Sequence, residues 1–264
     1  MGLPDAPYRR DLAQPSLPTP VPDAPDPQTE AKRAVGLAAA DLVQDGMRLG
    51  LGTGSTTAFA IQAIGRRVRD GLDVVGVPTS FAAERLARQS GVPTVGLDAL
   101  DLESARPPLD LALDGADEVD PGLNLVKGRG AAHVREKVVA ALAARFVVLV
   151  DAGKRVEVLG STQPVPVEVL PFAEPAVARA LRALGAEPEL RMGERKDGPV
   201  VTDQGLWVLD ARFGGIPEPR ALGAAIDGIP GVLGHGLFLG LATDVLVGEA
   251  GGRVLHLRAP ASSG

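Results

Sequence analysis

The sequence predicts an α/β fold with a mainly parallel sheet that carries helices on both faces, together with a smaller α+β domain. Short apolar runs alternate with helical stretches up to about residue 160, which is typical of crossover units in a parallel sheet. The runs are continuously apolar, as expected for strands that are buried on both faces. The length of 264 residues leaves room for a second, smaller domain.

The first domain is expected to follow a proline-rich segment, residues 1–28, which we interpret as a disordered, extended tail. Thr29 is predicted to cap a helix whose apolar face includes Ala31 and Val35, and Gly46 follows this helix as a stop. Strands and helices then alternate. They are expected at MRLGL, residues 56–69, LDVVGV, residues 81–89, LDLAL, residues 131–144 and FVVLV.

The pattern changes near Ser161, where a proline-bounded strand, PVPVEVLPF, precedes a helix over residues 174–184. PVVTD and GLWVLDARF are predicted to form a hairpin around Gln204 and Gly205, and a further helix covers residues 220–228. Closed by VLGHGLFLG, this order is typical of a split βαβ, or ferredoxin-like, unit. TDVLVG and GRVLHLR are expected to return to the first sheet.

The composition excludes several classes of function. The formal net charge is −6 and aromatic residues make up 3% of the chain, so the basic face and the stacking side chains that nucleic acids require are missing. Without cysteine, the chain cannot form disulfides, thiolate zinc sites, iron–sulfur clusters or a cysteine nucleophile. Residues 1–28 hold neither a secretory signal nor a membrane span. We expect a cytoplasmic protein with no nucleic-acid or membrane partner.

A glycine-rich turn, GLGTGSTT at residues 50–57, follows a short strand and opens a helix. Glycines let the backbone approach a ligand, and the helix N-terminus and the hydroxyls of Thr53, Ser55 and Thr56 offer donors, so the turn suits a phosphate. The dinucleotide fingerprint fails because Ser55 stands at its last glycine, and the nucleotide P-loop fails because no lysine follows the glycines. A tight connection with a helix cap is the alternative.

The acidic turn DGADEVD begins at Asp114, at the carboxyl end of the predicted strand LDLAL. Ligands bind at this edge of open α/β sheets, and carboxylates there can bind sugar hydroxyls, transfer protons or hold a metal. The spacing does not fit a calcium loop, and with histidines only at positions 133, 235 and 256 no zinc cluster is expected. An ordinary acidic surface turn is the alternative.

A second glycine-containing loop leads into the next helix and brings a cation and free N–H groups toward the acidic turn. This lysine loop consists of Lys127, Gly128, Arg129 and Gly130. On the helix, Glu136 is the candidate general base, although a solvated charge between two basic neighbours is the commoner role of such a residue. The packing side of the helix is expected to consist of Val134, Val138 and Leu142.

Five segments of the chain, in the same order, closely resemble those of type A ribose-5-phosphate isomerases. They are GLGTGSTT, DGADEVDPGLNLVKGRGAAHVREKVVA, FVVLVDAGKRVEVLG, PVPVEVLPF and VTDQGLWVLD. The match runs from about Thr29 to the C-terminus. Five segments in the correct order are far more specific than any single motif. We accordingly predict a Rossmann-like catalytic domain of residues 29–160 and 241–264 and a small domain of residues 161–240.

The resemblance implies an aldose–ketose isomerase of the non-oxidative pentose phosphate pathway. Such an enzyme interconverts D-ribose 5-phosphate and D-ribulose 5-phosphate through an enediol, with no cofactor and no metal. It also implies a homo-oligomer, either a dimer or a dimer of dimers, and places the catalytic base at Glu136 in the REK triplet. The implied substrate-binding residues are Thr53, Gly54, Ser55, Thr56, Asp114, Gly115, Ala116, Asp117, Lys127, Gly128, Arg129, Gly130 and Lys154, with Lys32 as a lower-ranked candidate.

We expect Glu136 to carry a proton from C2 to C1 of the sugar, while Lys127 and backbone N–H groups stabilise the enediolate. Asp114 is expected to handle hydroxyl protons and ring opening, and Asp117 to hold a hydroxyl. Arg129 departs from the family, which usually has KGGG where this chain has KGRG. We expect the Arg129 side chain to point outward, which preserves the loop.

Two other functions remain open at this point. One is a related sugar-phosphate enzyme, such as an amino-sugar phosphate deaminase, because folds of this kind serve several chemistries. The other is a non-catalytic sugar-phosphate sensor that keeps the pocket without turnover. The joint presence of Glu136, Lys127 and Asp114 argues against a sensor.

Overall fold

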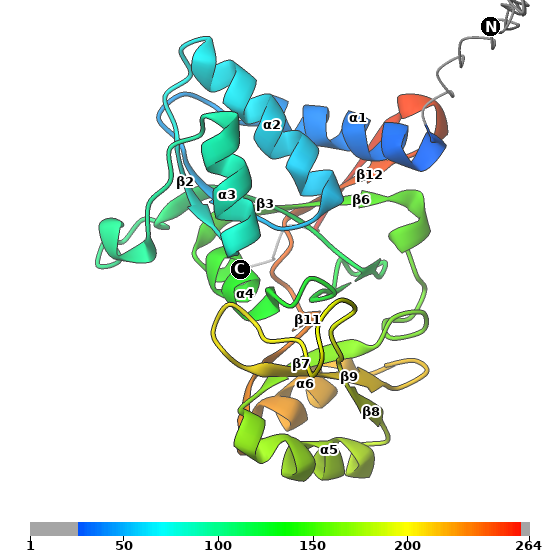
Figure 1. The fold of residues 1–264 in the computed structure, drawn as a ribbon. Helices are drawn as coiled ribbons and strands as arrows, with labels where there is room; N and C mark the ends of the chain where they lie inside the picture. The colour runs from blue at the N-terminus through cyan, green and yellow to red at the C-terminus, as the bar shows by residue number, and fades with distance from the viewer. Residues whose placement is uncertain (1–25, 260–264) are drawn as a thin grey trace, which may run out of the picture.

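The computed structural model describes residues 26–259 (Figure 1). Most of the predicted tail therefore lies outside the described residues. The first helix, α1 (Pro27–Asp41), begins three residues before the predicted start, and Asp26 rather than Thr29 is its N-cap. The Asp26 carboxylate accepts a hydrogen bond from the Thr29 N–H at 3.2 Å. Pro27 fits the first helical position because the N–H that proline lacks has no partner there in any helix.

The main sheet has six strands in the order β13-β12-β6-β3-β1-β2. Their bounds are β1 Arg48–Leu51, β2 Val75–Pro78, β3 Leu109–Gly115, β6 Ala143–Asp151, β12 Asp244–Gly248 and β13 Val254–Arg258. Neighbouring strands run parallel except that β13 pairs antiparallel with β12 at the edge. The predicted, mainly parallel sheet is confirmed, and so is the return of the last two strands to it.

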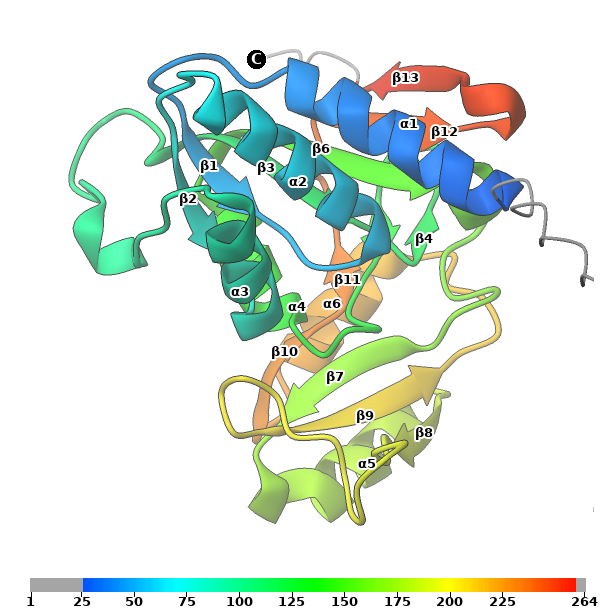
Figure 2. The ribbon, with the colours of Figure 1, turned by 45° about the horizontal axis from the view of Figure 1, so that its top comes forward.

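Helices cover both faces of this sheet (Figure 2). One face packs against α1, α2 (Ser55–Arg69) and α3 (Phe81–Ser90), and the other packs against α4 (His133–Ala141). Strand β6 shows why both faces are apolar, since Val147 and Leu149 join the first core and Val148 and Val150 the second. No helix within residues 26–259 is both long enough and apolar enough to cross a membrane.

A second unit is built on a four-stranded antiparallel sheet in the order β10-β7-β9-β8. Its elements in chain order are β7 Val165–Val169, α5 Glu174–Ala183, β8 Glu187–Leu190, β9 Trp207–Arg212, α6 Pro219–Asp227 and β10 Val232–His235. Val177 of α5 and Ile226 of α6 share a core with Val167 and Leu209 of the sheet. This is the split βαβ arrangement that the sequence predicts.

The predicted turn around Gln204 and Gly205 is present, since the Thr202 N–H donates to the Leu206 carbonyl at 2.9 Å, but the predicted pairing of two strands there is wrong. Residues 199–203 form no strand, and β9 pairs instead with β7 and with β8. Strand β8 escapes prediction because EPEL contains a proline and two charged residues and lies, half exposed, at the edge of the sheet. Thr202 donates to the Glu168 carboxylate at 2.6 Å, so side-chain contacts fix the segment that was expected to pair.

A third, three-stranded sheet joins the two units (Figure 1). It consists of β4 (Glu118–Val119), β5 (Leu125–Val126) and β11 (Leu237–Phe238), all antiparallel. The predicted strand VLGHGLFLG is thus divided between β10 and β11. Short 3-10 turns complete the description at Leu97–Ala99, Ala152–Lys154, Pro171–Ala173 and Ala250–Gly252.

Candidate functional site

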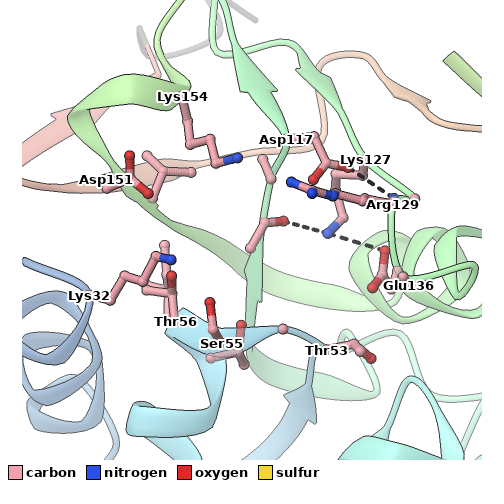
Figure 3. A pocket seen from close by; sticks show the side chains of 18 residues that line it. Lys32, Thr53, Ser55, Thr56, Asp117, Lys127, Arg129, Glu136, Asp151 and Lys154 are labelled. Atoms are coloured by element: carbon pink, nitrogen blue, oxygen red, sulfur yellow. Dashed lines mark hydrogen bonds and ion pairs between the residues drawn. The ribbon is translucent and has the colours of Figure 1, made fainter. Parts of the chain in front are cut away.

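A cavity of about 350 Å³ lies at the carboxyl ends of β1, β3 and β6 (Figure 3). Strand β2 lies on one side of β1 and β3 on the other, so the connections that leave β1 and β3 diverge there. Such a switch point is where open α/β sheets bind ligands. All the site residues predicted from the sequence except Asp114 line this cavity, together with Lys32, Thr57, Leu149, Val150 and Asp151.

The glycine-rich turn forms one wall of the cavity. Gly54 adopts a φ of 121°, which favours glycine, and is the N-cap residue of α2. A Cβ on Gly52 would lie 2.2 Å from Asp114 Cγ, so glycine at this position lets the turn approach the acidic turn. Because the first N–H groups of a helix have no partners within the helix, the start of α2 presents donors to an anion.

The Thr53 hydroxyl does not offer the free donor that the sequence suggests. It lies 2.7 Å from Ser80 Oγ and 3.1 Å from Thr79 Oγ1, and so is engaged with residues at the start of α3. The Thr53 N–H donates to Asp114 Oδ1 at 3.1 Å. Thr53 therefore fixes the turn, whereas Ser55 and Thr56 extend from the first turn of α2 along the cavity (Figure 3).

Lys127 lies between two carboxylates at the other end of the cavity. Its Nζ atom is 3.2 Å from Asp114 Oδ2 and 3.2 Å from Glu136 Oε2, and it donates to the Gly115 carbonyl oxygen. The three charged side chains are only 3–5% exposed. Because water is excluded, the charges interact more strongly here than at a protein surface.

The charges in this cluster control one another's protonation. Burial raises the pKa of Glu136 to about 8, and the negative charge of Asp114 adds to this effect. Burial also raises the pKa of Asp114. Burial alone would lower the pKa of Lys127, but the charges of Asp114 and Glu136 outweigh it and raise that pKa. Lys127 is therefore cationic at neutral pH, while Glu136 can both accept and release a proton.

Helix α4 presents Glu136 to the cavity. The predicted packing side of this helix is wrong, because Val138 is 44% exposed and Val134 only half-buried. The buried positions are His133, Glu136, Val139 and Ala140, which recur at helical spacing. The face of α4 that contains Glu136 is thus the one that faces the interior. The sequence pattern does not show which side of α4 is buried, because α4 carries valine on both sides.

Two acids of the acidic turn, Asp114 and Asp117, have different places at the site. Asp114 lies behind the cavity wall, where its Oδ1 accepts hydrogen bonds from the N–H groups of Thr53 and Gly115 at 3.1 and 2.7 Å. Asp117 lines the cavity, and its Oδ2 accepts from the Arg129 N–H at 3.0 Å. Asp114 therefore orients Lys127, whereas Asp117 is placed to contact a ligand.

The expectation that Arg129 points outward is wrong. Its side chain is exposed but extends over the cavity (Figure 3). The opposite side of the loop is occupied by the Arg191 guanidinium, which donates to the Gly128 and Arg129 carbonyl oxygens. Positive φ angles occur at Gly128 (111°) in the loop and at Ala131 (56°) directly after it, so Arg129 replaces a glycine without adopting a left-handed backbone.

Further cations come from two other elements. Lys154 follows β6 in the Ala152–Lys154 turn, and Lys32 belongs to α1; both line the cavity with the start of α2 (Figure 3). Asp151, which sequence reasoning missed, caps this turn by accepting the Gly153 N–H at 3.1 Å. Its position after FVVLV, like that of Asp114 after LDLAL, is a signal that could have identified it.

Within residues 26–259 no group of three or more histidine, aspartate or glutamate side chains is arranged to hold a metal ion. The electrophile that the cavity itself offers is the Lys127 ammonium, and the other residues of the lysine loop line the same cavity. The arrangement can therefore hold an anion at α2, neutralise a developing oxyanion at Lys127 and transfer a proton at Glu136.

Sequence comparisons identify similar proteins. A family model described as ribose 5-phosphate isomerase A (phosphoriboisomerase A) matches residues 75–252. The ribose-5-phosphate isomerase A of Thermosynechococcus vestitus is 60% identical over 226 residues, which cover 85% of this chain and 93% of that protein. The protein of the same name from Haloarcula marismortui is 54% identical over 222 residues, which cover 84% of this chain and 93% of that protein.

Solved structures agree with the sequence comparison. Ribose 5-phosphate isomerase A from Methanocaldococcus jannaschii superposes with a TM-score of 0.81 at 45% identity, covering 87% of this chain and 98% of that chain. A D-ribose-5-phosphate isomerase in complex with phospho-erythronic acid gives a TM-score of 0.81 at 43% identity, with the same coverage.

Proposed function

This chain belongs to the ribose 5-phosphate isomerase A family and interconverts ribose 5-phosphate and ribulose 5-phosphate, a reaction that we propose takes place in the cavity around Glu136. It is an aldose–ketose isomerase, and its reaction is a step of the pentose phosphate pathway. The relatives named above are isomerases, and nothing about them favours a deaminase or a sensor.

Glu136 is the proposed base. Moving the carbonyl between C1 and C2 requires removal of a proton from C2, whose acidity comes only from the neighbouring carbonyl, and its return to C1. A carboxylate that burial brings to a pKa of about 8 can take this proton and give it back. The observation that carries the proposal is the placement of buried Glu136 at the cavity, 3.2 Å from the Lys127 ammonium.

Lys127 is the proposed electrophile. The enediolate places negative charge on oxygen when the C2 proton leaves, and a fixed ammonium stabilises that charge without reorganisation of water. Asp114 holds Lys127 in this position at 3.2 Å, which makes Asp114 a partner of the cation. We retain ring opening and hydroxyl proton transfer as a further proposed role of Asp114.

The phosphate is proposed to bind at the start of α2. The N–H groups and hydroxyls of Ser55 and Thr56 supply donors there, and Lys32 and Lys154 supply positive charge at the same cavity. Asp117 and the lysine loop, including Arg129, are then left to contact the sugar hydroxyls. Binding of the distant phosphate helps to hold C1 and C2 against Glu136. A relative in complex with phospho-erythronic acid supports a phosphorylated acyclic ligand.

We also propose that the chain works in the cytoplasm as a homodimer or a dimer of dimers. Support for an assembly comes from family membership and from the apolar side chains of Leu170, Phe172 and Leu233, which are 49%, 92% and 53% exposed. The proposed domains are residues 29–160 with 241–264, which hold the six-stranded sheet, and residues 161–240, which hold the four-stranded sheet.

The variant Glu136→Gln tests the base, because it keeps the shape of the side chain and removes its proton acceptor. We expect kcat with ribose 5-phosphate to fall by about 10²- to 10⁴-fold. Glu187→Gln, on exposed strand β8, is the matched control and should retain activity. Turnover by Glu136→Gln near the wild-type rate would contradict the assignment. Release of ammonia from an amino-sugar phosphate would instead favour a deaminase.

A further inference from the structure

We propose that Arg191 is a positioning residue that reaches from the second unit of the fold and holds the lysine loop in its catalytic geometry. The inference rests on the proposed role of the lysine loop in stabilising the enediolate. Arg191 follows β8 directly, and nothing in the sequence motifs of the cavity points to it. It does not line the catalytic cavity, so any effect on the reaction must act through the loop.

The contacts of Arg191 are those of a clamp. Its Nη1 atom donates to the Gly128 carbonyl oxygen at 2.9 Å and to the Arg129 carbonyl oxygen at 3.0 Å. Its Nε atom donates to Asp210 Oδ2 at 2.7 Å, and Nη2 donates to Asp210 Oδ1. The planar guanidinium is thus fixed along one edge by a carboxylate of β9 and presents another N–H group to the loop.

By holding carbonyl groups of the lysine loop, Arg191 also fixes the direction of the N–H groups that follow them. In a trans peptide the carbonyl and the next N–H point in opposite directions. When Arg191 holds the carbonyls of Gly128 and Arg129, the N–H groups of Arg129 and Gly130 face away from it. The Arg129 N–H donates to Asp117 Oδ2 at 3.0 Å, and both Asp117 and Gly130 line the cavity.

The lysine loop is poorly packed on the side that faces the second unit, so its position there depends on hydrogen bonds. A second cavity, of about 550 Å³, lies between the lysine loop and the second unit, and Arg129, Gly130, Arg191 and Asp210 line it. Packing on that side is therefore incomplete. Lys127 is anchored by its N–H, which donates to the Gly236 carbonyl at 2.8 Å. Beyond it, the Gly128 carbonyl accepts from the Ala131 N–H and the Arg129 N–H donates to Asp117, and on the side of the second unit both carbonyls of the loop accept from Arg191.

The test compares Arg191→Ala with Arg48→Ala in the full-length protein. Arg48 is a matched control because it also pairs with an aspartate, Asp110, and donates to a carbonyl, that of Pro107, but lies on β1 away from the cavity. We expect Arg191→Ala to lower kcat about tenfold or more, with KM for ribose 5-phosphate within about threefold. Free guanidinium chloride at low concentration should restore part of the kcat, and Arg48→Ala should show neither effect.

Two further variants keep the proposal testable if the alanine variant does not fold. Arg191→Lys retains the positive charge but lacks the planar guanidinium with its several N–H donors. Asp210→Asn retains Arg191 but weakens the ion pair that holds it. Both variants should have a lower kcat without a higher KM. Unchanged kcat in these variants would overturn the proposal. It would also be overturned if kcat fell and KM rose by the same factor, in proportion to a fall in Tm, because that is the result of a general loss of stability. If Glu136→Gln is inactive while Arg191 variants are fully active, the clamp is wrong and the proposed base stands.

Discussion

Glu136 combines two properties that rarely occur together, deep burial and a need to ionise. Burial and the charge of Asp114 raise its pKa to about 8. The base must be deprotonated to accept the C2 proton, so activity should be lost as the pH falls through this value. Removing the charge of Asp114 would lower the pKa of Glu136, and the same loss would then occur at lower pH.

This gives a prediction for the pH dependence. In the wild-type enzyme, kcat/KM should rise as the pH increases toward about 8 and then level off. In Asp114→Asn the rising limb should move to lower pH, even if the plateau falls because Lys127 is less well oriented. The test is to measure kcat/KM against pH for both proteins. A rising limb at the same pH in Asp114→Asn as in the wild type would show that the charge of Asp114 does not affect the pKa of Glu136.

Backbone strain directly after the lysine loop falls on Ala131, whose φ is 56°. An L-residue in the left-handed region costs on the order of 1 kcal/mol relative to glycine. Ala131→Gly should therefore raise the free energy of unfolding by up to about 1 kcal/mol, as measured by urea denaturation. Gly128→Ala is the opposite case, since φ there is 111° and a Cβ would lie 2.8 Å from His133 Nδ1. It should destabilise the protein; equal stabilities would contradict this view of the loop.

Individual residues differ in how far the sequence identifies them. Glu136 and Lys127 can be selected because a motif and a family resemblance mark them. The clamp by Arg191 cannot, because it depends on contacts between residues 62 and 63 positions apart in the chain. The N-cap at Asp26 was missed although Pro27 at the next position favours a helix start, because this proline belongs to a proline-rich segment that was interpreted as a tail.

Among the elements, strands are predictable where they are buried and apolar. The strands of the parallel sheet are continuous apolar runs, and each was expected within a few residues of its place. The sequence misleads in opposite ways for two segments: β8 is a strand that is not predicted, and residues 199–203 are predicted as a strand but form none. EPEL pairs despite its proline because β9 offers an edge. PVVTD, with its two valines, forms no strand and makes only isolated backbone contacts: a bridge between Pro199 and Met192, and hydrogen bonds from the Val200 and Thr202 N–H groups to the Arg191 and Leu206 carbonyls.

The segment around Asp203 fixes an element of the first unit. Asp203 Oδ2 accepts the Phe81 N–H, the first of α3, at 2.8 Å and lies 3.8 Å from Arg135 Nη1. It therefore acts as an additional cap for α3, next to Ser80, which contacts Thr53.

Asp203→Ala should accordingly lower the free energy of unfolding by about 1 kcal/mol in urea denaturation. The control is Asp197→Ala, an exposed position in the connection between β8 and β9. A loss of stability no larger than in this control would show that the contact with α3 has no structural weight.

At the scale of the whole molecule, the two units meet around the residues that follow β3. Glu118 is fully buried and its carboxylate accepts hydrogen bonds from the N–H groups of Gly160, Thr162 and Gln163, which lead into β7. One residue earlier, Asp117 lines the cavity. The alternation of strands and helices predicts each unit separately, but not this junction, because its sheet is built from two-residue strands distant in the chain.

The molecule is acidic overall, with a formal net charge of −6, yet the cavity gathers cations. Lys32, Lys127, Arg129 and Lys154 come from α1, the lysine loop and the turn after β6. Composition alone therefore says nothing of the anion site, which arises only when the fold brings three separate parts of the chain to one edge of the sheet.

The central claim is that Glu136 moves the carbon-bound proton. It is tested most directly by following the C2 hydrogen of ribose 5-phosphate by NMR in D2O, with wild-type enzyme and with Glu136→Gln at saturating substrate. Wild-type enzyme should replace the C2 proton with deuterium while ketose forms. The variant should still bind substrate but neither exchange the C2 proton nor form ketose. Exchange of the C2 proton by Glu136→Gln at the wild-type rate would contradict the account.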